Sequence, residues 1–354
     1  MAVLHGGQLS RIAKLYDIPE QQWLDLSTGI APFSYPIPEI SNKTWQDLPI
    51  VGDDLLTVAK QYYQAKYCWP VSGSQSLIEK LPDLWRDKNS ANKLSPKHVY
   101  LPKVGYKEHQ QAWQQAQYKL HFYQQHLPEE IENNSVVVVI NPNNPLNDKF
   151  SIEALKALQI CCEKSNSLLI IDEAFADILK PKFSFVSHIK ENTEDVIVLR
   201  SFGKFFGLAG IRIGFVCSGL IWFNIIKQSS GPWAINGPAL AITQKALQDK
   251  KWHKQQIERL QTQSEKQQQL IADYLPAVCI EANALFITVF LNNAPDVYHL
   301  FCLQGLYVRL TDENDALRFG ISTDLQLIKL QKILADCRHT ITTMLAINTN
   351  GPNQ

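Results

Sequence analysis

The sequence has no net charge and no long apolar segment. Its 34 lysine and arginine residues balance its 34 aspartate and glutamate residues, so total charge favours neither nucleic acid nor an anionic membrane as a partner. No uninterrupted apolar run approaches about 18 residues, the length that a membrane-spanning helix needs. The N-terminus lacks the apolar stretch of a secretory signal and carries His5 and Arg11. We therefore expect a soluble, cytoplasmic protein without a membrane or nucleic-acid partner.

Cysteine is too scattered for a framework of disulfide bonds. The seven cysteines are odd in number and include no CxxC pair. Zinc cages and disulfide-stapled domains both need closer and more regular spacing. We expect free thiols in a reducing compartment and no metal centre.

The sequence is long enough for a sizeable core and contains regularly placed apolar runs. Its 354 residues, 45% of them hydrophobic, suffice for two compact units. Four runs rich in Val, Ile and Leu are predicted to be buried strands: 136–141, 168–175, 195–202 and 211–218. Between the first two runs, residues 151–166 have helical apolar spacing, and Ser151 is the expected N-cap. Strand, helix and strand at this spacing predict an α/β fold with a mostly parallel central sheet flanked by helices.

The chain after about residue 235 has a different pattern. A long polar helix is predicted at roughly 239–274 and a final helix near 324–345. Strand-like pieces lie between them, at 279–291, 306–310 and 317–322. This composition predicts a smaller α+β domain. We expect three parts: an N-terminal segment (1–45) that packs on the small domain, a large cofactor-binding domain (46–235) and a C-terminal small domain (236–354).

Polar side chains gather where the predicted strands of the large domain end. In open α/β sheets, ligands bind beyond the carboxyl ends of the strands. Asn144 follows the first of these strands, Asp172 ends the core of the second, Ser201 and Lys204 follow the third, and Arg212 opens the fourth. Each residue alone has an ordinary explanation, such as a turn, a helix cap or a surface lysine. As a set, they suit one cofactor, pyridoxal 5′-phosphate (PLP).

The chemistry of PLP explains this combination of side chains. A lysine forms a Schiff base with the aldehyde, and a carboxylate keeps the pyridine nitrogen protonated so that the ring can accept electrons. A hydroxyl and a forked guanidinium suit the phosphate. The turn VSGSQS opens an amphipathic stretch, where backbone N–H groups of Gly73, Ser74 and Gln75 are expected to complete a phosphate-binding cup. The alternative for this turn is an ordinary Gly/Ser connection.

The segments NPNNP, IIDEAF and SFGKFFGLAGIRIGF resemble, in order and spacing, the signatures of fold-type I PLP-dependent aminotransferases. The resemblance covers nearly the whole chain and implies that family's fold and its homodimer, with active sites at the subunit boundary. The implied cofactor contacts are Lys204 to the aldehyde, Asp172 to the pyridine nitrogen, Asn144 to the 3′-oxygen, Ser201 and Arg212 to the phosphate, and Tyr106 stacked on the ring.

Two positions depart from the commonest pattern of this family. Many members have Tyr three residues after the aspartate, where this chain has Phe175. Because no phenol then donates to the 3′-oxygen, we expect the pKa of the imine formed with Lys204 to be raised. A tyrosine that the neighbouring subunit commonly gives to the phosphate is also missing, and Leu48 lies where we would look for it.

The segment HGGQLSRIAKLYDIPEQQWLDLSTGIAPFSYP resembles the N-terminus of the threonine-phosphate decarboxylases of cobalamin biosynthesis, which are close relatives of histidinol-phosphate aminotransferases. The resemblance implies that His5, Gly6 and Gly29 face the substrate, whereas the alternative for HGG is a plain flexible turn. Phe175 and the segment GPWAINGPAL also fit the decarboxylases. Ala31 stands where that subgroup often has Asn, so the resemblance supports no side-chain contact there.

Arg309 and Arg318 fall within apolar, strand-like runs. An arginine there is expensive to bury unless it is paired with an anion. One explanation is an internal ion pair, for instance with Asp312 or Glu313. The other follows from the resemblance: Arg318 binds the substrate carboxylate, Arg309 contributes to the carboxylate or the phosphate, and Asn144 also contacts the substrate.

The predicted activity is PLP-dependent decarboxylation of L-threonine O-3-phosphate to (R)-1-amino-2-propanol O-2-phosphate, without a metal. A histidinol-phosphate-type aminotransferase is the alternative, because it shares every cofactor residue. The two reactions differ in which bond at the α-carbon stands perpendicular to the cofactor ring. A more remote alternative is a non-catalytic sensor module with the same fold, but this chain has no DNA-binding extension before it.

Overall fold

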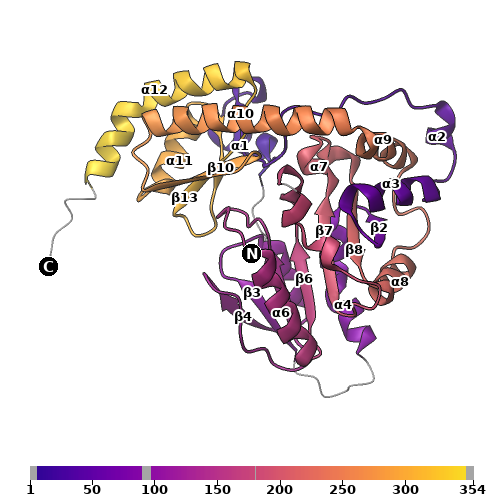
Figure 1. Ribbon diagram of the computed structural model, residues 1–354. Coiled ribbons are helices and arrows are strands. Elements are labelled where there is room, and N and C mark those ends of the chain that lie inside the picture. Colours follow the sequence, from indigo (N-terminus) through magenta and orange to yellow (C-terminus); the bar gives the residue numbers. More distant parts are fainter. Residues whose placement is uncertain (1–5, 90–96, 180, 348–354) are drawn as a thin grey trace. The chain divides into compact units, whose positions relative to one another are not determined.

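The computed structural model describes residues 6–89, 97–179 and 181–347 (Figure 1). These residues form two compact units. The larger unit comprises Tyr35–Asn144 and Asp148–Trp252. The smaller unit comprises the described residues up to Ser34, the short piece Pro145–Asn147 and the described residues from His253 onward.

The larger unit is built on a seven-stranded sheet with the order β2-β8-β7-β6-β5-β3-β4. Its strands are β2 (Tyr67–Val71), β3 (His98–Pro102), β4 (Lys119–Tyr123), β5 (Val136–Ile140), β6 (Leu168–Asp172), β7 (Val196–Ser201) and β8 (Gly214–Ser218). Within this sheet, β8 pairs antiparallel with both of its neighbours and the other pairings are parallel. The predicted α/β class with a mostly parallel sheet is confirmed.

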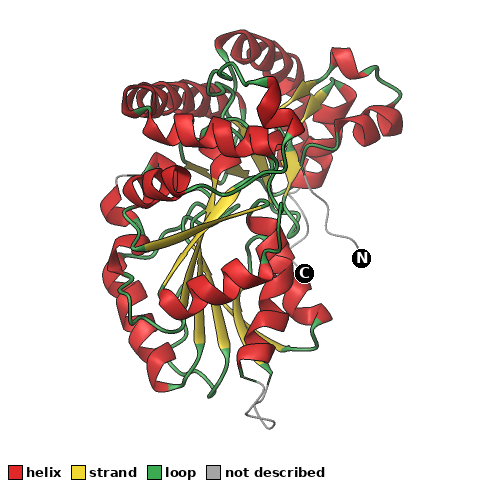
Figure 2. Ribbon diagram, turned by 90° about the vertical axis from the view of Figure 1, so that its right-hand side faces the viewer, coloured by secondary structure: helices red, strands yellow, loops and turns green. Residues whose placement is uncertain are grey.

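The central strands are buried on both faces. In β5, Val136 and Val138 pack with side chains of α4, α5 and α8, while Val137 and Val139 point to the opposite face and are equally buried. Figure 2 shows helices on both sides of the yellow strands. This double burial explains why these strands are continuous apolar runs without alternation.

Helices fill the connections between the strands of the larger unit. They are α2 (Asn42–Gln46), α3 (Asp53–Tyr63), α4 (Ser74–Lys88), α5 (Lys107–Gln115), α6 (Ile152–Lys164), α7 (Phe202–Phe205), α8 (Leu220–Ser229) and α9 (Gly237–Gln248). Short 3-10 turns lie at Ala176–Ile178, Pro181–Phe183, Phe185–His188 and Ala209–Ile211. The predicted N-cap of α6 is present, because Ser151 Oγ accepts the backbone N–H of Ala154 at 3.2 Å.

The smaller unit combines two small sheets with helices. β1 (Leu24–Asp25) pairs with β11 (Leu306–Tyr307), and an antiparallel sheet has the order β12-β13-β10-β9. The latter strands are β9 (Cys279–Ala282), β10 (Phe286–Phe290), β12 (Arg309–Leu310) and β13 (Ala316–Gly320). The helical elements are α1 (Leu9–Tyr16), the 3-10 turn Glu20–Gln22, α10 (Lys250–Tyr274), which begins three residues before this unit, α11 (Ala294–Leu303) and α12 (Asp324–Ile347). Apolar side chains of α10, α11 and α12 share one core with this sheet.

Two elements predicted as continuous are interrupted. The helix predicted over 239–274 is two helices, because Asp249 leaves the helical conformation (φ −81°, ψ 72°). Its Oδ1 accepts the N–H of Trp252 at 3.0 Å, as an N-cap does. The predicted strand 279–291 is the hairpin β9–β10, turned at Asn283, whose Oδ1 accepts the N–H of Leu285 at 2.7 Å. In both places a polar side chain satisfies backbone donors that the regular element would otherwise use.

None of the helices in the described part of the chain combines the length and the apolarity needed to cross a membrane.

Candidate active site

The predicted cofactor residues lie in the larger unit, at one edge of its sheet. Asp172 is the last residue of β6, Ser201 is the last residue of β7, and Lys204 lies in α7 directly afterwards. Asn144 comes four residues after β5, and Gly73 comes two residues after β2. Because β2, β5, β6 and β7 run in the same direction, their carboxyl ends share this edge, where α/β enzymes bind ligands.

Asp172 is a buried carboxylate held by a histidine. Its Oδ2 lies 2.9 Å from Nε2 of His109, and its Oδ1 accepts the N–H of Ala174 at 3.0 Å. Asp172 is 3% exposed and His109 is 1% exposed. A carboxylate without a proton only accepts hydrogen bonds, so it would pair here with the histidine tautomer that carries hydrogen on Nε2. The two contacts orient a negative charge at the strand end, as a protonated pyridine nitrogen needs.

The sequence reasoning missed His109. It lies three residues after Tyr106, on the buried face of α5. The two rings meet edge to face, with centroids 6.2 Å apart. A spacing of three places side chains on the same helix face, so the histidine could have been found from its distance to the expected stacking tyrosine.

The turn before α4 packs against Arg212. Gly73 has φ +76°, and a Cβ there would lie 2.8 Å from Nη2 of Arg212. Arg212 does not open a strand as predicted: it ends the 3-10 turn Ala209–Ile211 with φ +57°, and β8 begins at Gly214. A guanidinium beside the N-terminus of a 15-residue helix is a favourable place for a phosphate.

Ser201 reaches the same place through sheet register. It is paired with Gly214 of β8, where a Cβ would lie 3.0 Å from the backbone N of Ser74. The Ser201 hydroxyl makes no capping hydrogen bond to α7. A hydroxyl, a guanidinium and helix N–H groups therefore converge, and this donor set fits the phosphate of PLP.

Hydrogen bonds and one ring contact connect this cup to Asp172. The Tyr106 hydroxyl donates to Oε1 of Gln75 at 3.1 Å, and Nε2 of Gln75 donates to Oε2 of Glu108 at 2.7 Å. Tyr106 also contacts His109, which holds Asp172. One continuous set of contacts thus links the start of α4 to the carboxylate, the two ends between which an aromatic cofactor would lie.

Lys204 lies beside the position that departs from the family pattern. Its Nζ is 5.4 Å from the ring centroid of Phe175, which is buried. Phe175 follows Asp172 by three residues, so the amine lies beside the segment that leaves the carboxylate. The loop that carries Asn144 is held to the loop after β3, since Nδ2 of Asn143 donates to the Val104 carbonyl at 3.0 Å.

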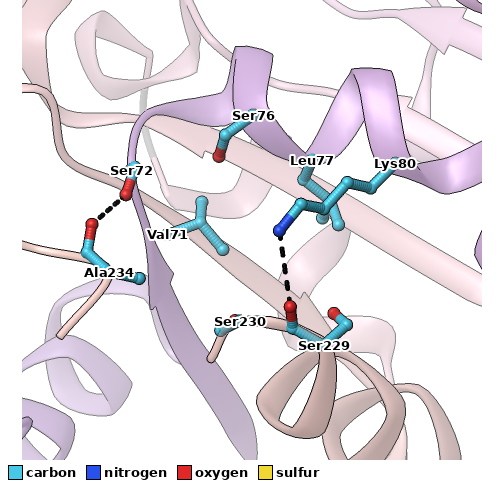
Figure 3. Close-up of a pocket in the computed structure, with 8 residues that line it drawn as sticks. All are labelled: Val71, Ser72, Ser76, Leu77, Lys80, Ser229, Ser230 and Ala234. Atoms are coloured by element: carbon cyan, nitrogen blue, oxygen red, sulfur yellow. Dashed lines mark hydrogen bonds between the residues drawn. The ribbon is translucent and has the colours of Figure 1, made fainter. Parts of the chain in front are cut away.

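The cavity in Figure 3 is a separate feature of the larger unit. It encloses about 50 Å³ and is lined by residues of β2, α4, the end of α8 and the loop after α8. Lys80 Nζ donates to the Ser229 carbonyl at 3.3 Å, and Ser72 Oγ donates to the Ala234 carbonyl. None of the predicted cofactor residues lines it. This cavity is therefore not the cofactor site.

The predicted substrate residues belong to the smaller unit, except Asn144, and His5 lies outside the described residues. Gly6 is in close contact with Ser27, whose carbonyl oxygen would lie 2.2 Å from a Cβ at residue 6. Nη2 of Arg318 donates to the same carbonyl at 2.9 Å. Gly29 is buried two residues further along. Two of the predicted residues, Gly6 and Arg318, thus contact Ser27.

Arg309 and Arg318 are direct cross-strand neighbours on β12 and β13. Arg309 has the internal ion pair considered above, with Nη2 3.0 Å from Oδ1 of Asp312. Burial and the neighbouring Arg309 lower the pKa of Arg318 well below its usual range, despite Asp312. The surroundings of Arg318 therefore disfavour its positive charge, and a bound anion would relieve this cost.

Replacing Gly73 by Ala is expected to weaken PLP binding about tenfold or more, because the added Cβ displaces the Arg212 guanidinium. The matched control is Gly231→Ala, which also has positive φ (+65°) but has no atom within 4 Å of the added Cβ. Dissociation constants for PLP and for pyridoxal, which has no phosphate, measure the effect. Equal PLP affinity of the two variants, or an equal loss for pyridoxal, would contradict a phosphate cup at Gly73.

Comparison with known proteins agrees with this geometry. The family model for aminotransferase class I and II matches residues 54–323. The chain is 35% identical over 323 residues to a threonine-phosphate decarboxylase from Pseudomonas aeruginosa, covering 90% of this chain and 93% of that protein. It is 28% identical over 214 residues to a histidinol-phosphate aminotransferase from Ruminiclostridium cellulolyticum, covering 59% of this chain and 58% of that protein.

A solved structure shares the fold. The histidinol-phosphate aminotransferase from Sinorhizobium meliloti in complex with pyridoxal-5′-phosphate has a TM-score of 0.78 at 14% identity, covering 96% of each chain. The predicted fold-type I architecture is thereby confirmed. From the family match over most of its length, the chain belongs to the aminotransferase class I and II family.

Proposed function

We propose that the protein is a PLP-dependent threonine-phosphate decarboxylase, which converts L-threonine O-3-phosphate to (R)-1-amino-2-propanol O-2-phosphate. The observation that carries this proposal is its similarity, over nearly the full length of both chains, to a decarboxylase of that name. The adjacent arginines 309 and 318 support it, because the substrate carries two anionic groups.

The larger unit supplies the groups that the cofactor needs. When bound, PLP withdraws the electron pair that departing carbon dioxide leaves on the α-carbon. Asp172, oriented by His109, holds the proton on the pyridine nitrogen. Lys204 binds the aldehyde carbon and later returns a proton to the α-carbon of the substrate. Ser201, Arg212 and the start of α4 hold the phosphate of the cofactor.

The arginines of the smaller unit orient the substrate. Arg318 binds the carboxylate, and Arg309 contributes to the carboxylate or to the substrate phosphate. For decarboxylation, the bond from the α-carbon to the carboxylate must stand perpendicular to the ring. We assign the choice of that bond to Arg318, because a guanidinium fork fixes the direction of a carboxylate.

A histidinol-phosphate-type aminotransferase is the second candidate, since the chain also resembles such an enzyme over part of its length. The purified enzyme, given phosphothreonine, is expected to release carbon dioxide and the amino alcohol phosphate in equal amounts. Lys204→Ala should lower this rate by several orders of magnitude, because the cofactor loses its covalent anchor. Amino transfer to 2-oxoglutarate without carbon dioxide release would instead support the aminotransferase.

The role of Arg318 can be separated from that of Arg309 with substrate and product. Arg318→Met is expected to lower kcat/KM for phosphothreonine about 100-fold, the loss typical when a charge-assisted pair is broken. Inhibition by the product should stay at wild-type strength, because the product has no carboxylate. Arg309→Met is the companion variant, which tests the contribution of Arg309 to binding of the substrate phosphate. Equal loss of substrate and product binding in Arg318→Met would overturn the assignment.

A second copy of this chain is the proposed partner. Four large apolar side chains of the larger unit are between 62% and 82% exposed within residues 37–50: Ile37, Trp45, Leu48 and Ile50. Exposed apolar groups this close in sequence mark an interaction surface. A homodimer that covers these four side chains agrees with the homodimer that the family resemblance implies.

Trp45→Glu is expected to shift the protein toward the monomer, because a carboxylate would then have to be buried in the interface. Leu325→Glu, at an 81% exposed position of α12, is the matched control. Analytical ultracentrifugation measures the mass of each protein. A wild-type monomer, or a Trp45→Glu dimer as stable as the control, would contradict an interface at this surface.

A cytoplasmic location is the accompanying proposal. All seven cysteines are free thiols. Cys217 Sγ donates a hydrogen bond to Cys68 Sγ at 3.7 Å, directly opposite on β8 and β2, and the two thiols form no disulfide. Neighbouring thiols persist in this state in a reducing compartment.

A further inference from the structure

A buried arginine lies between the strand ends that carry Asp172 and Ser201. Arg200, 4% exposed, is the residue before Ser201 on β7. Its Nη1 donates to Oε2 of Glu173, and its Nη2 donates to Oδ1 of Asp177, both at 2.7 Å. These carboxylates come one and five residues after Asp172. The guanidinium therefore bridges the end of β7 to the segment that leaves β6.

The bridge is reinforced on both sides. Nη1 of Arg200 also donates to Oγ of Ser184 at 3.1 Å, and Glu173 Oε1 accepts the N–H of Phe185 at 2.6 Å. The hydroxyl of Tyr62, on α3, donates to Oδ1 of Asp177 at 3.0 Å. This network, which we call the Arg200 clamp, links Arg200 on β7 to the segment that follows β6 and to α3.

The clamp needs arginine for both charge and shape. Burial raises the pKa of Glu173, and Arg200 opposes that rise. Burial lowers the pKa of Arg200, but Asp177 and Glu173 raise it more, so the guanidinium stays charged. A planar fork can bind two carboxylates at fixed directions, whereas a lysine ammonium is a single point with a flexible stem. The geometry, beyond the charge, is specific to arginine.

We propose that Arg200 is a positioning residue that sets the placement of Asp172 relative to Lys204 and Ser201. It acts through its contacts with Glu173, Asp177 and Ser184, which lie in the segment that follows Asp172. The inference rests on the proposed function, because it presumes that PLP lies between Asp172 and Lys204. Sites of this kind depend on supporting residues that fix the groups in direct contact with the ligand.

The opposite end of the same strand offers a matched comparison. Asp195 directly precedes β7, and its Oδ1 lies 2.9 Å from Nζ of Lys88 and accepts the indole N–H of Trp222 at 3.0 Å. The side chains of Lys88 and Asp195 are 20% and 17% exposed. This ion pair also ties β7 to a neighbouring helix, but it lies at the amino end, away from the cofactor residues.

The experiment compares the holoenzymes of wild type, Arg200→Lys, Asp177→Asn and Lys88→Met. We expect PLP to dissociate about tenfold faster from Arg200→Lys than from wild type. The pH midpoint of the visible cofactor band should also rise, because a misplaced Asp172 holds the pyridine proton less firmly. Asp177→Asn should change both quantities in the same direction. Lys88→Met should lower the unfolding temperature but leave both quantities unchanged.

Thermal unfolding of each variant separates positioning from stability. If Arg200→Lys and Asp177→Asn lose stability like Lys88→Met but keep the wild-type dissociation rate and pH midpoint, Arg200 is structural only and the inference is overturned. Should Arg200→Lys not fold, Asp177→Asn decides by the same two readouts. A wild-type protein that binds no PLP would instead refute the proposed function.

Discussion

A buried negative charge at the carboxyl end of β6 is the constraint on which the rest of this site depends. A buried carboxylate in an apolar sheet needs hydrogen-bond partners, and His109 together with the Ala174 N–H provides them. A carboxylate is useful at this place because the ring nitrogen of the cofactor can carry a proton, and with it a positive charge.

The central sheet holds this carboxylate in a rigid environment. Strands β5, β6 and β7 are covered on both faces, so their backbone is rigid up to the edge where the polar residues begin. Beyond that edge the connections are polar and hydrogen-bonded: the Arg200 clamp follows β6, and Arg212 packs on Gly73 after β2. Rigid strands and tightly bonded loops together preorganise a site that has to hold a flat ring in one position.

The sequence predicted the parts of this site that are encoded locally. Buried strands are visible as apolar runs, and Asp172 and Lys204 lie in short segments with a familiar spacing. The pairing of His109 with Asp172 spans 63 residues, so the only local sign of this histidine is its spacing of three from Tyr106. The partners of Arg200 could not be predicted either, since a single arginine in an apolar strand does not indicate which carboxylates it binds. The left-handed conformation of Arg212 and the helix break at Asp249 each depend on a single residue. A hydrophobic pattern is read over many residues, so it does not reveal them.

The central claim is that Asp172 keeps the cofactor ring protonated. Nuclear magnetic resonance of the holoenzyme carrying PLP labelled with ¹⁵N at the pyridine nitrogen tests it directly. The account predicts the chemical shift of a protonated pyridine nitrogen in the wild type across neutral pH, and that of an unprotonated nitrogen in Asp172→Asn. An unprotonated nitrogen in the wild-type holoenzyme would contradict the account.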